Sequence, residues 1–243
     1  MRTFTSVELA EQEKHYRTNL INSLSGFKSL QLLGTKNQNG ATNLAVFNSV
    51  FHVGANPPYL GLVVRPDGPE HDTLKNILSQ ENYTLNNVKE EFYQQAHQTS
   101  ARYVSGESEF KACGFNEEYI VDFPVPFVKE SSIQIGLKLK EVIPVKVNGT
   151  TIVIGEIMLI RLDEKYLLND GIVDLEAAGS ITVAGLDSYH RTQKIGRLAY
   201  AKPDVAPKNL PFTVLFLVIG LIVSRCYFIQ PILISQIPIN GFC

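Results

Sequence analysis

Two β-rich runs joined by an Asn-Gly pair constrain the fold of this chain most strongly. Residues 132–147 and 150–164 are dense in β-branched and apolar side chains, and Asn148-Gly149 lies between them. An Asn-Gly pair in this setting is the strongest short-range sign of a β-hairpin, because both central residues of a two-residue turn adopt positive φ. The sequence therefore predicts two long antiparallel strands.

Shorter β-rich segments precede this hairpin. They are separated by turn residues and by prolines, which cannot donate to a strand ladder. The predicted strands cover residues 27–36, 42–54, 56–66 and 83–88. Helices are predicted over 6–24, near 73–80 and over 88–103.

Long antiparallel strands with two helices inserted between them favour a mainly β fold. The regular alternation of strands and helices that marks a doubly wound sheet is missing. We therefore expect a β-barrel with inserted helices over residues 25–165, followed by an extension over 166–200.

The bulk composition excludes some classes of protein. The chain has 243 residues and a formal net charge of −2, and its lysines and arginines form no block. Nucleic-acid binding is not expected, because neutralising phosphates needs clustered basic side chains. The three cysteines, Cys113, Cys226 and Cys243, are far apart and make neither a disulfide framework nor a CxxC pair. Together with a polar N-terminus, this predicts a cytoplasmic protein.

The last 34 residues differ from the rest of the chain. From Leu210 onward the only charged residue is Arg225, and apolar runs dominate. A membrane-spanning helix needs about 20 apolar residues, and Arg225, Gln230 and Pro231 interrupt this stretch. A membrane contact through residues 210–239, a hydrophobic helix packed on another surface and an aberrant C-terminus all remain open.

Common catalytic signatures are missing from the sequence. It contains no GxGxxG after a strand, no GxxxxGK[ST], no GxSxG and no HExxH. Its five histidines are too scattered for a metal site defined by spacing. No metal site is therefore predicted.

The stretch RPDGPEHDTLKNIL, residues 65–78, is a candidate anion site. It follows a predicted buried strand and begins a helix at Asp72 or Thr73. A helix N-terminus offers unpaired N–H groups and a partial positive charge. Arg65 adds a guanidinium that can bind phosphate with two parallel hydrogen bonds. The alternative is that Asp72 caps the helix and Arg65 is a solvated strand end.

Two further stretches carry polar side chains in unusual density. Alternation on the strand TNLAVFNSV places Asn43, Ala45, Phe47 and Ser49 on one face, a mixture that suits a flat heterocycle better than a hydrocarbon core. The other stretch, AHQTSARY, concentrates hydroxyl, amide and imidazole groups where a helix should end. A frayed helix end is the alternative for the second stretch.

Taken in order, these stretches resemble the flavin reductase-like family with the FMN-binding split-barrel fold. The most specific pieces are NLAVFNSVFHVGANPPYLGLVVRP and AHQTSARY with the SEF that follows it, and the resemblance covers residues 25–203. It implies a six-stranded split β-barrel and a homodimer with FMN near the subunit interface. The chain then divides into an N-terminal helical extension (1–24), the split-barrel domain (25–203) and a hydrophobic tail of uncertain structure (204–243).

The resemblance also implies site residues. The flavin ring and ribityl chain are expected to contact Asn43, Leu44, Ala45 and Ser49. The phosphate is expected to contact Arg65, Thr73 and Asn76. A second flavin-contacting segment is expected to contribute His97, Thr99 and Ser100. His190, in GLDSYHR, is expected near the nicotinamide.

The expected function is that of an NAD(P)H:flavin oxidoreductase. FMN would be cofactor or substrate, NAD(P)H the hydride donor, and a flavin-dependent acceptor or oxygenase the consumer of reduced flavin. Such a reaction needs no protein acid or base, which agrees with the missing catalytic signatures. An FMN-binding electron carrier or sensor without NAD(P)H turnover is the main alternative. A membrane-tethered interaction protein is another, suggested only by the tail.

Overall fold

The computed structural model describes residues 1–66, 72–104 and 106–210. The chain forms two compact units, one of Met1–Leu167 with Val173–Lys194 and one of Leu168–Ile172 with Ile195–Cys243. All the predicted site residues belong to the first unit. Residues 211–243, and with them most of the predicted tail, lie outside the described residues. Among the described residues, no helix is both long and apolar enough to cross a membrane.

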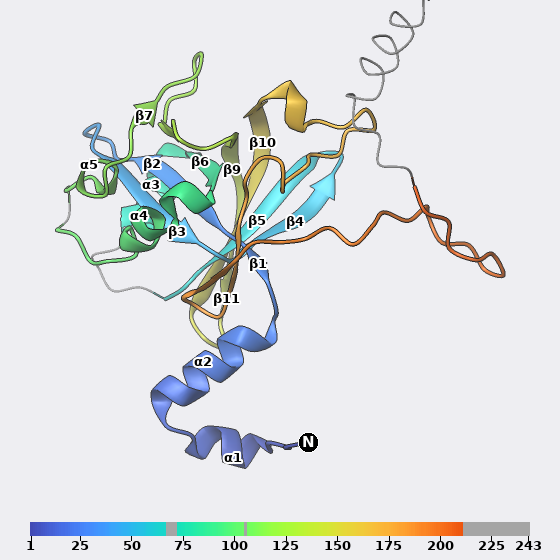
Figure 1. Cartoon of the computed structure of the whole chain (residues 1–243). Helices are drawn as coiled ribbons and strands as arrows, with labels where there is room; N and C mark the ends of the chain where they lie inside the picture. Colours follow the sequence, from blue (N-terminus) through green and yellow to red (C-terminus); the bar gives the residue numbers. More distant parts are fainter. Residues whose placement is uncertain (67–71, 105, 211–243) are drawn as a thin grey trace, which may run out of the picture. The chain divides into compact units, whose positions relative to one another are not determined.

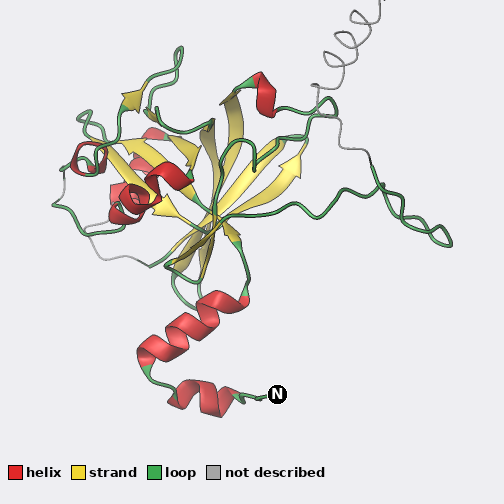
Figure 2. Ribbon diagram, viewed as in Figure 1, coloured by secondary structure: helices red, strands yellow, loops and turns green. Residues whose placement is uncertain are grey.

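The first unit is built on a large antiparallel sheet (Figure 2). More of its described residues are in strands than in helices. Its seven described strands follow the order β3-β2-β6-β9-β10-β5-β4. They are β2 (Gln31–Lys36), β3 (Thr42–Phe47), β4 (Val50–Ala55), β5 (Pro58–Val64), β6 (Asn82–Asn87), β9 (Ile133–Val145) and β10 (Thr150–Leu162). Smaller pairings join β1 (Lys28–Ser29), β11 (Thr182–Ala184) and β12 (Ser188–His190), and β7 (Glu117–Glu118) with β8 (Phe127–Val128). The mainly β, split-barrel fold is thus confirmed.

The predicted hairpin is present, but its turn is longer than expected. β9 and β10 pair from Val145 opposite Thr150, which leaves a four-residue loop, 146–149. Of these four described residues only Gly149 has a positive φ, +74°. The Asn148 side chain accepts hydrogen bonds from the backbone N–H and the hydroxyl of Thr150, at 3.1 and 2.8 Å. The expectation of a two-residue turn was therefore wrong, although the Asn-Gly pair does close the hairpin.

The segment predicted as one long strand over 42–54 forms two strands. The ladder breaks at Asn48-Ser49, where the Ser49 hydroxyl donates to the carbonyl of Val63 at 2.7 Å and accepts from its N–H at 3.3 Å. This break gives the sheet seven strands in place of the expected six. It also moves the chain from one edge of the sheet to the other, because β3 and β4 are the two edge strands.

Two of the three predicted helices are shorter than expected. The first predicted helix forms two separate helices, α1 (Ser6–Glu11) and α2 (Lys14–Leu24). They are separate because the Glu13 carboxylate caps α2 by accepting hydrogen bonds from two backbone N–H groups. α3 spans Asp72–Gln80, so Asp72 belongs to its first turn. The third predicted helix is reduced to η1 (Glu90–Phe92) and α4 (Tyr93–Gln98). The remaining helical segments are α5 (Glu109–Ala112) and η2 (Glu164–Tyr166).

Two apolar clusters hold the unit together. Leu33, on β2, joins residues of β5, β6, β9, β10 and α3 in one cluster, and its neighbour Leu32 joins the other cluster, on the opposite face. The second cluster lies where α4, α5 and β11 contribute Ala96, Phe110 and Val183. Helices α3, α4 and α5 accordingly pack beside β2 and β3 (Figure 1). Each fully buried Leu or Phe contributes about 1.5–3 kcal/mol to folding.

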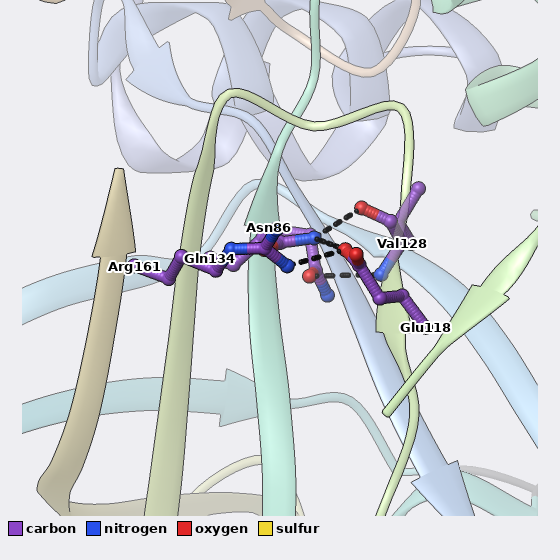
Figure 3. Close-up of polar contacts among 5 residues, drawn as sticks. All are labelled: Asn86, Glu118, Val128, Gln134 and Arg161. Carbon is purple, nitrogen blue, oxygen red and sulfur yellow. Dashed lines mark hydrogen bonds and ion pairs between the residues drawn. The ribbon is translucent and has the colours of Figure 1, made fainter. Parts of the chain in front are cut away.

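A largely buried polar cluster lies in this unit, at β6, β7, β8, β9 and β10 (Figure 3). Asn86, fully buried on β6, accepts from the N–H of Val128 at 3.0 Å and donates to the carbonyl of Leu32 at 3.0 Å. Gln134 donates to the carbonyl of Val128 at 2.8 Å and to the carboxylate of Glu118 at 3.0 Å. These bonds fasten the short β7–β8 pair to the main sheet.

Candidate functional site

A cavity of about 810 Å³ lies next to β3 in the first unit. Its walls come from β3 and the break that follows it, the end of β5, the start of α3, residues 97–104 and 107–109, and the turn between β11 and β12. Most of the predicted site residues line this cavity: Asn43, Ala45, Ser49, Arg65, Thr73, His97, Thr99 and Ser100. The fold therefore brings together residues that are far apart in the sequence.

The β3 wall follows the predicted alternation in part, because Val46 lines the cavity as well. Asn43, Ala45 and Phe47 line the cavity, whereas the side chain of Leu44 is fully buried in the core. The backbone N–H of Leu44 donates to the carboxylate of Glu109 at 2.9 Å. Small and aromatic side chains on one strand face leave room for a flat ring against the backbone.

One end of the cavity is suited to an anion. Arg65 and Lys28 both line it, and so does Thr73 in the first turn of α3. The amide of Asn43 donates to the Thr73 hydroxyl at 3.0 Å, and within the described part of the chain no acceptor takes the hydroxyl proton of Thr73. A guanidinium, an ammonium and a hydroxyl are the donors that phosphate groups bind.

Another part of the wall is formed by the end of α4. The hydroxyls of Thr99 and Ser100 donate to the carbonyls of Ala96 and His97, at 2.8 and 2.7 Å. A hydroxyl has one proton, so these two oxygens present lone pairs to a ligand and can accept its hydrogen bonds. This wall therefore suits the donor groups of a ligand.

His97 is fixed by an aromatic partner. Its Nδ1 lies 2.6 Å from the hydroxyl of Tyr189, on β12, and the two rings meet edge to face with centroids 5.9 Å apart. Tyr189 also packs against Tyr93, with ring centroids 5.2 Å apart. Burial raises the pKa of Tyr189, so its phenol stays neutral at physiological pH.

Three predicted residues lie away from the lining. Leu44 is in the core, and Asn76 is buried on α3, where its amide donates to the Thr35 hydroxyl of β2 at 3.1 Å. The ring of His190 packs edge-on against Phe27, and its Nε2 is buried without a hydrogen-bond partner among the described residues. In the GLDSYHR segment the cavity is lined by Leu186, Asp187 and Tyr189 instead.

Sequence reasoning also missed several lining residues. Asn22 and Lys28 belong to segments with no recognised motif, and Arg102, Glu107 and Glu109 follow the AHQTS stretch. Burial raises the pKa of Glu109, although the N–H of Leu44 opposes this shift. The sequence offered one signal for Glu109 and Tyr189, which is that they lie within or next to stretches already singled out. Glu109 is the acid of the SEF piece, and Tyr189 directly precedes His190.

Known structures resemble this chain closely. A split-barrel protein from Shewanella frigidimarina NCIMB 400, provisionally assigned as a flavin reductase, is 45% identical and matches 83% of this chain and 100% of its own with a TM-score of 0.80. The nitrilotriacetate monooxygenase component B of Bacillus cereus is 20% identical, over 82% of this chain and 100% of its own, with a TM-score of 0.72. An FMN-binding protein from Thermus thermophilus is 15% identical, over 79% and 96% of the two chains, with a TM-score of 0.58. The last two likenesses show the fold alone.

The fold and the cavity therefore define a flavin-related oxidoreductase built on a split barrel. Residues 28–173 match the family described as flavin reductase like domain, and the chain belongs to that family.

Proposed function

We propose that this protein is a flavin reductase that binds FMN and transfers a hydride from NAD(P)H to flavin. The observation that carries the proposal is one cavity that joins a flat strand face, at Ala45, to a cationic end with Arg65 and Thr73. Its volume of about 810 Å³ is within the range of pockets that hold cofactors. The donor set also fits, because FMN carries an uncharged ring at one end and a phosphate monoester at the other.

The residues of the chain would hold such a ligand in three ways. Arg65 and Thr73 would bind the phosphate, and the β3 backbone beside Ala45 would lie against the ring. Thr99 and Ser100 would accept hydrogen bonds from ligand donors. A bound flavin supplies the hydride acceptor for reduced nicotinamide, and the protein contributes orientation and electrostatics.

His97 and its partner Tyr189 form one part of the cavity wall. Burial raises the pKa of Tyr189, so its phenol carries no charge at physiological pH, and its hydroxyl lies within hydrogen-bonding distance of Nδ1 of His97. The pair fixes the imidazole ring as part of the wall. Neither group is required to transfer a proton during hydride transfer, so both act by shaping the cavity.

The absorbance spectrum and the NAD(P)H oxidation rate of the purified full-length protein test this proposal. We expect either a flavin spectrum, or a colourless protein that accelerates NAD(P)H oxidation when FMN is added. Flavin binding with no oxidation above a control without protein would indicate an electron carrier or sensor. A protein that neither binds flavin nor oxidises NAD(P)H would contradict both functions.

We further propose a homodimer with the flavin near its interface. In support, the edge strand β4 exposes two large apolar side chains, Phe51 and Val53, at 41% and 42% of their surface. Exposed apolar side chains on an edge strand favour association. Light scattering after gel filtration should give twice the chain mass of 27.1 kDa, whereas a monomer at micromolar concentration would contradict the proposal.

The reduced flavin would serve a separate flavin-dependent acceptor or oxygenase. The Bacillus cereus neighbour, named as a component of a monooxygenase, supports this assignment through the shared fold. Adding a flavin-dependent monooxygenase that has no reductase of its own would test it, with substrate hydroxylation dependent on this protein and NAD(P)H as the expected result.

A further inference from the structure

Asn22, near the C-terminal end of α2, links the N-terminal extension to the cationic end of the cavity. Its side-chain oxygen accepts a hydrogen bond from Nη2 of Arg65 at 3.2 Å. Its backbone carbonyl accepts from Nζ of Lys28 at 2.8 Å. All three residues line the same cavity. A single residue therefore contacts both cations at this end.

The orientation of the Asn22 side chain is determined by its own helix. Its Nδ2 donates to the carbonyl of Thr18, one turn earlier, at 2.8 Å. Rotating the amide by half a turn would place Oδ1 of Asn22 against the carbonyl oxygen of Thr18. The side-chain oxygen must therefore point toward Arg65. The carbonyl contact with Lys28 has a separate cause, because the last carbonyls of a helix lack partners and carry partial negative charge.

The contact leaves the guanidinium free to bind an anion. Arg65 has five N–H donors, and the bond to Asn22 uses one of them. Arg65 is exposed and has a long side chain, so without a partner it would sample many rotamers and lose that freedom when a ligand binds. Asn22 restricts it before binding, which is preorganisation.

Apolar packing does not explain why α2 lies here. No residue of α1 or α2, both fully described, is buried. Contacts from α2 to the rest of the unit therefore depend strongly on polar groups such as those of Asn22. This arrangement favours a role in the site over a role in the core.

We propose that Asn22 is a positioning residue for phosphate binding, which makes α2 part of the anion-binding end of the cavity. Asn22 holds Arg65 and Lys28 where a phosphate monoester, as in FMN, meets both. The inference rests on the proposed function, since it takes the phosphate-bearing ligand to be a flavin mononucleotide. Asn22 acts through the two cations and not on the reacting atoms.

Titration of the full-length protein with FMN and with riboflavin, followed by flavin fluorescence, tests this role. Asn22→Ala should weaken FMN binding about fivefold and leave riboflavin binding unchanged, because only FMN carries the phosphate. Asn19→Ala, an exposed asparagine of the same helix, is the matched control and should change neither. A purely structural role of Asn22 would weaken both ligands together.

A double-mutant cycle with Arg65→Ala separates the possible failures. In the Arg65→Ala background, Asn22→Ala should weaken FMN binding less than about twofold, because its partner is gone.

If Arg65→Ala weakens FMN binding and Asn22→Ala does not, the positioning role is overturned and the proposed function stands. Tighter FMN binding by Asn22→Ala would overturn it too, since Asn22 would then compete with phosphate for Arg65. If Arg65→Ala affects FMN and riboflavin equally, the phosphate assignment itself fails and the inference fails with it.

Discussion

Polar side chains have opposite roles in the cavity and in the polar cluster of Figure 3. In the cluster, Asn86 and Gln134 are almost fully buried, and their amides bond to backbone groups and side chains of the same unit. In the cavity, Arg65 and Thr73 each have one side-chain hydrogen-bond partner among the described residues and keep donors in reserve. Polar groups satisfied within the fold stabilise it, whereas groups with donors left over are suited to a ligand.

This contrast has an energetic basis. A buried donor or acceptor without a partner costs about 1–3 kcal/mol, so the cluster tolerates little change. A donor that faces a cavity is hydrated when no ligand is present and carries no such penalty. Substitutions in the cluster should therefore lower stability, and substitutions in the cavity should lower affinity.

Asn86→Leu should have the largest effect on stability. It removes the partners of the Val128 N–H and the Leu32 carbonyl, both inside the unit, and we expect the free energy of unfolding to fall by about 4 kcal/mol. Urea denaturation measures this loss. Asn82→Leu, on the same strand but bonded only to the nearby Gln80 carbonyl, is the control and should cost less than about 1 kcal/mol. Equal losses in both variants would refute the distinction.

The neighbours Leu44 and Ala45 test the same contrast on one strand. Leu44→Ala should destabilise the protein by about 3 kcal/mol, because it opens a cavity in the core. Ala45→Leu should change stability by less than about 1 kcal/mol and reduce flavin affinity at least about tenfold, because the added atoms fill the ring site. Thermal unfolding and flavin content of the two variants give both readouts. Unchanged flavin content in Ala45→Leu would contradict the assignment of the β3 face.

Arg65→Ala should leave the fold intact and reduce FMN affinity about tenfold, which corresponds to the loss of one charge-assisted contact. Riboflavin affinity should change less than about twofold, because it lacks the phosphate that the guanidinium would bind. Fluorescence titration measures both. Lys111→Ala, an exposed cation on α5, controls for the change in net charge and should bind FMN as the unaltered protein does.

The smallest effect is expected at Glu118, where the polar cluster reaches the surface. The hydrogen bond from Arg161 lowers the pKa of Glu118 below 4.5. Its ionised form therefore stabilises the fold above that pH, and the contribution disappears as the pH falls through the lowered pKa. Glu118→Gln should cost less than about 1 kcal/mol at pH 7, and this cost should shrink as the pH falls through the lowered pKa.

Melting temperatures measured from pH 3 to pH 7 test this expectation. The difference between Glu118→Gln and the unaltered protein should grow as the pH rises from 3 to 5. Glu141→Gln, which replaces an exposed acid on β9, is the control for the change in net charge. A difference that is constant with pH would mean that the charge of Glu118 does not matter.

Much of the sheet could be predicted from local pattern. The β9–β10 hairpin follows from the Asn-Gly pair, and the separation of Leu44 from Ala45 follows from the two-residue period of a strand. The split-barrel family and most of the cavity lining came from the resemblance, since the polar stretches alone left structural alternatives open. Helix lengths were overestimated, because capping by Glu13 and the carbonyl bonds of Thr99 end helices that the apolar pattern would continue.

The sequence by itself determined which side chains share a strand face and where the chain turns, because these properties depend on residues within a few positions of each other. Only the tertiary structure decided that β3 and β4 occupy opposite edges of one sheet, that Asn22 meets Arg65, and that Tyr189 rather than His190 lines the cavity. Those facts depend on the register of strands that lie far apart in the chain. A shift of one residue in that register would exchange the faces of a strand, and no local pattern records it.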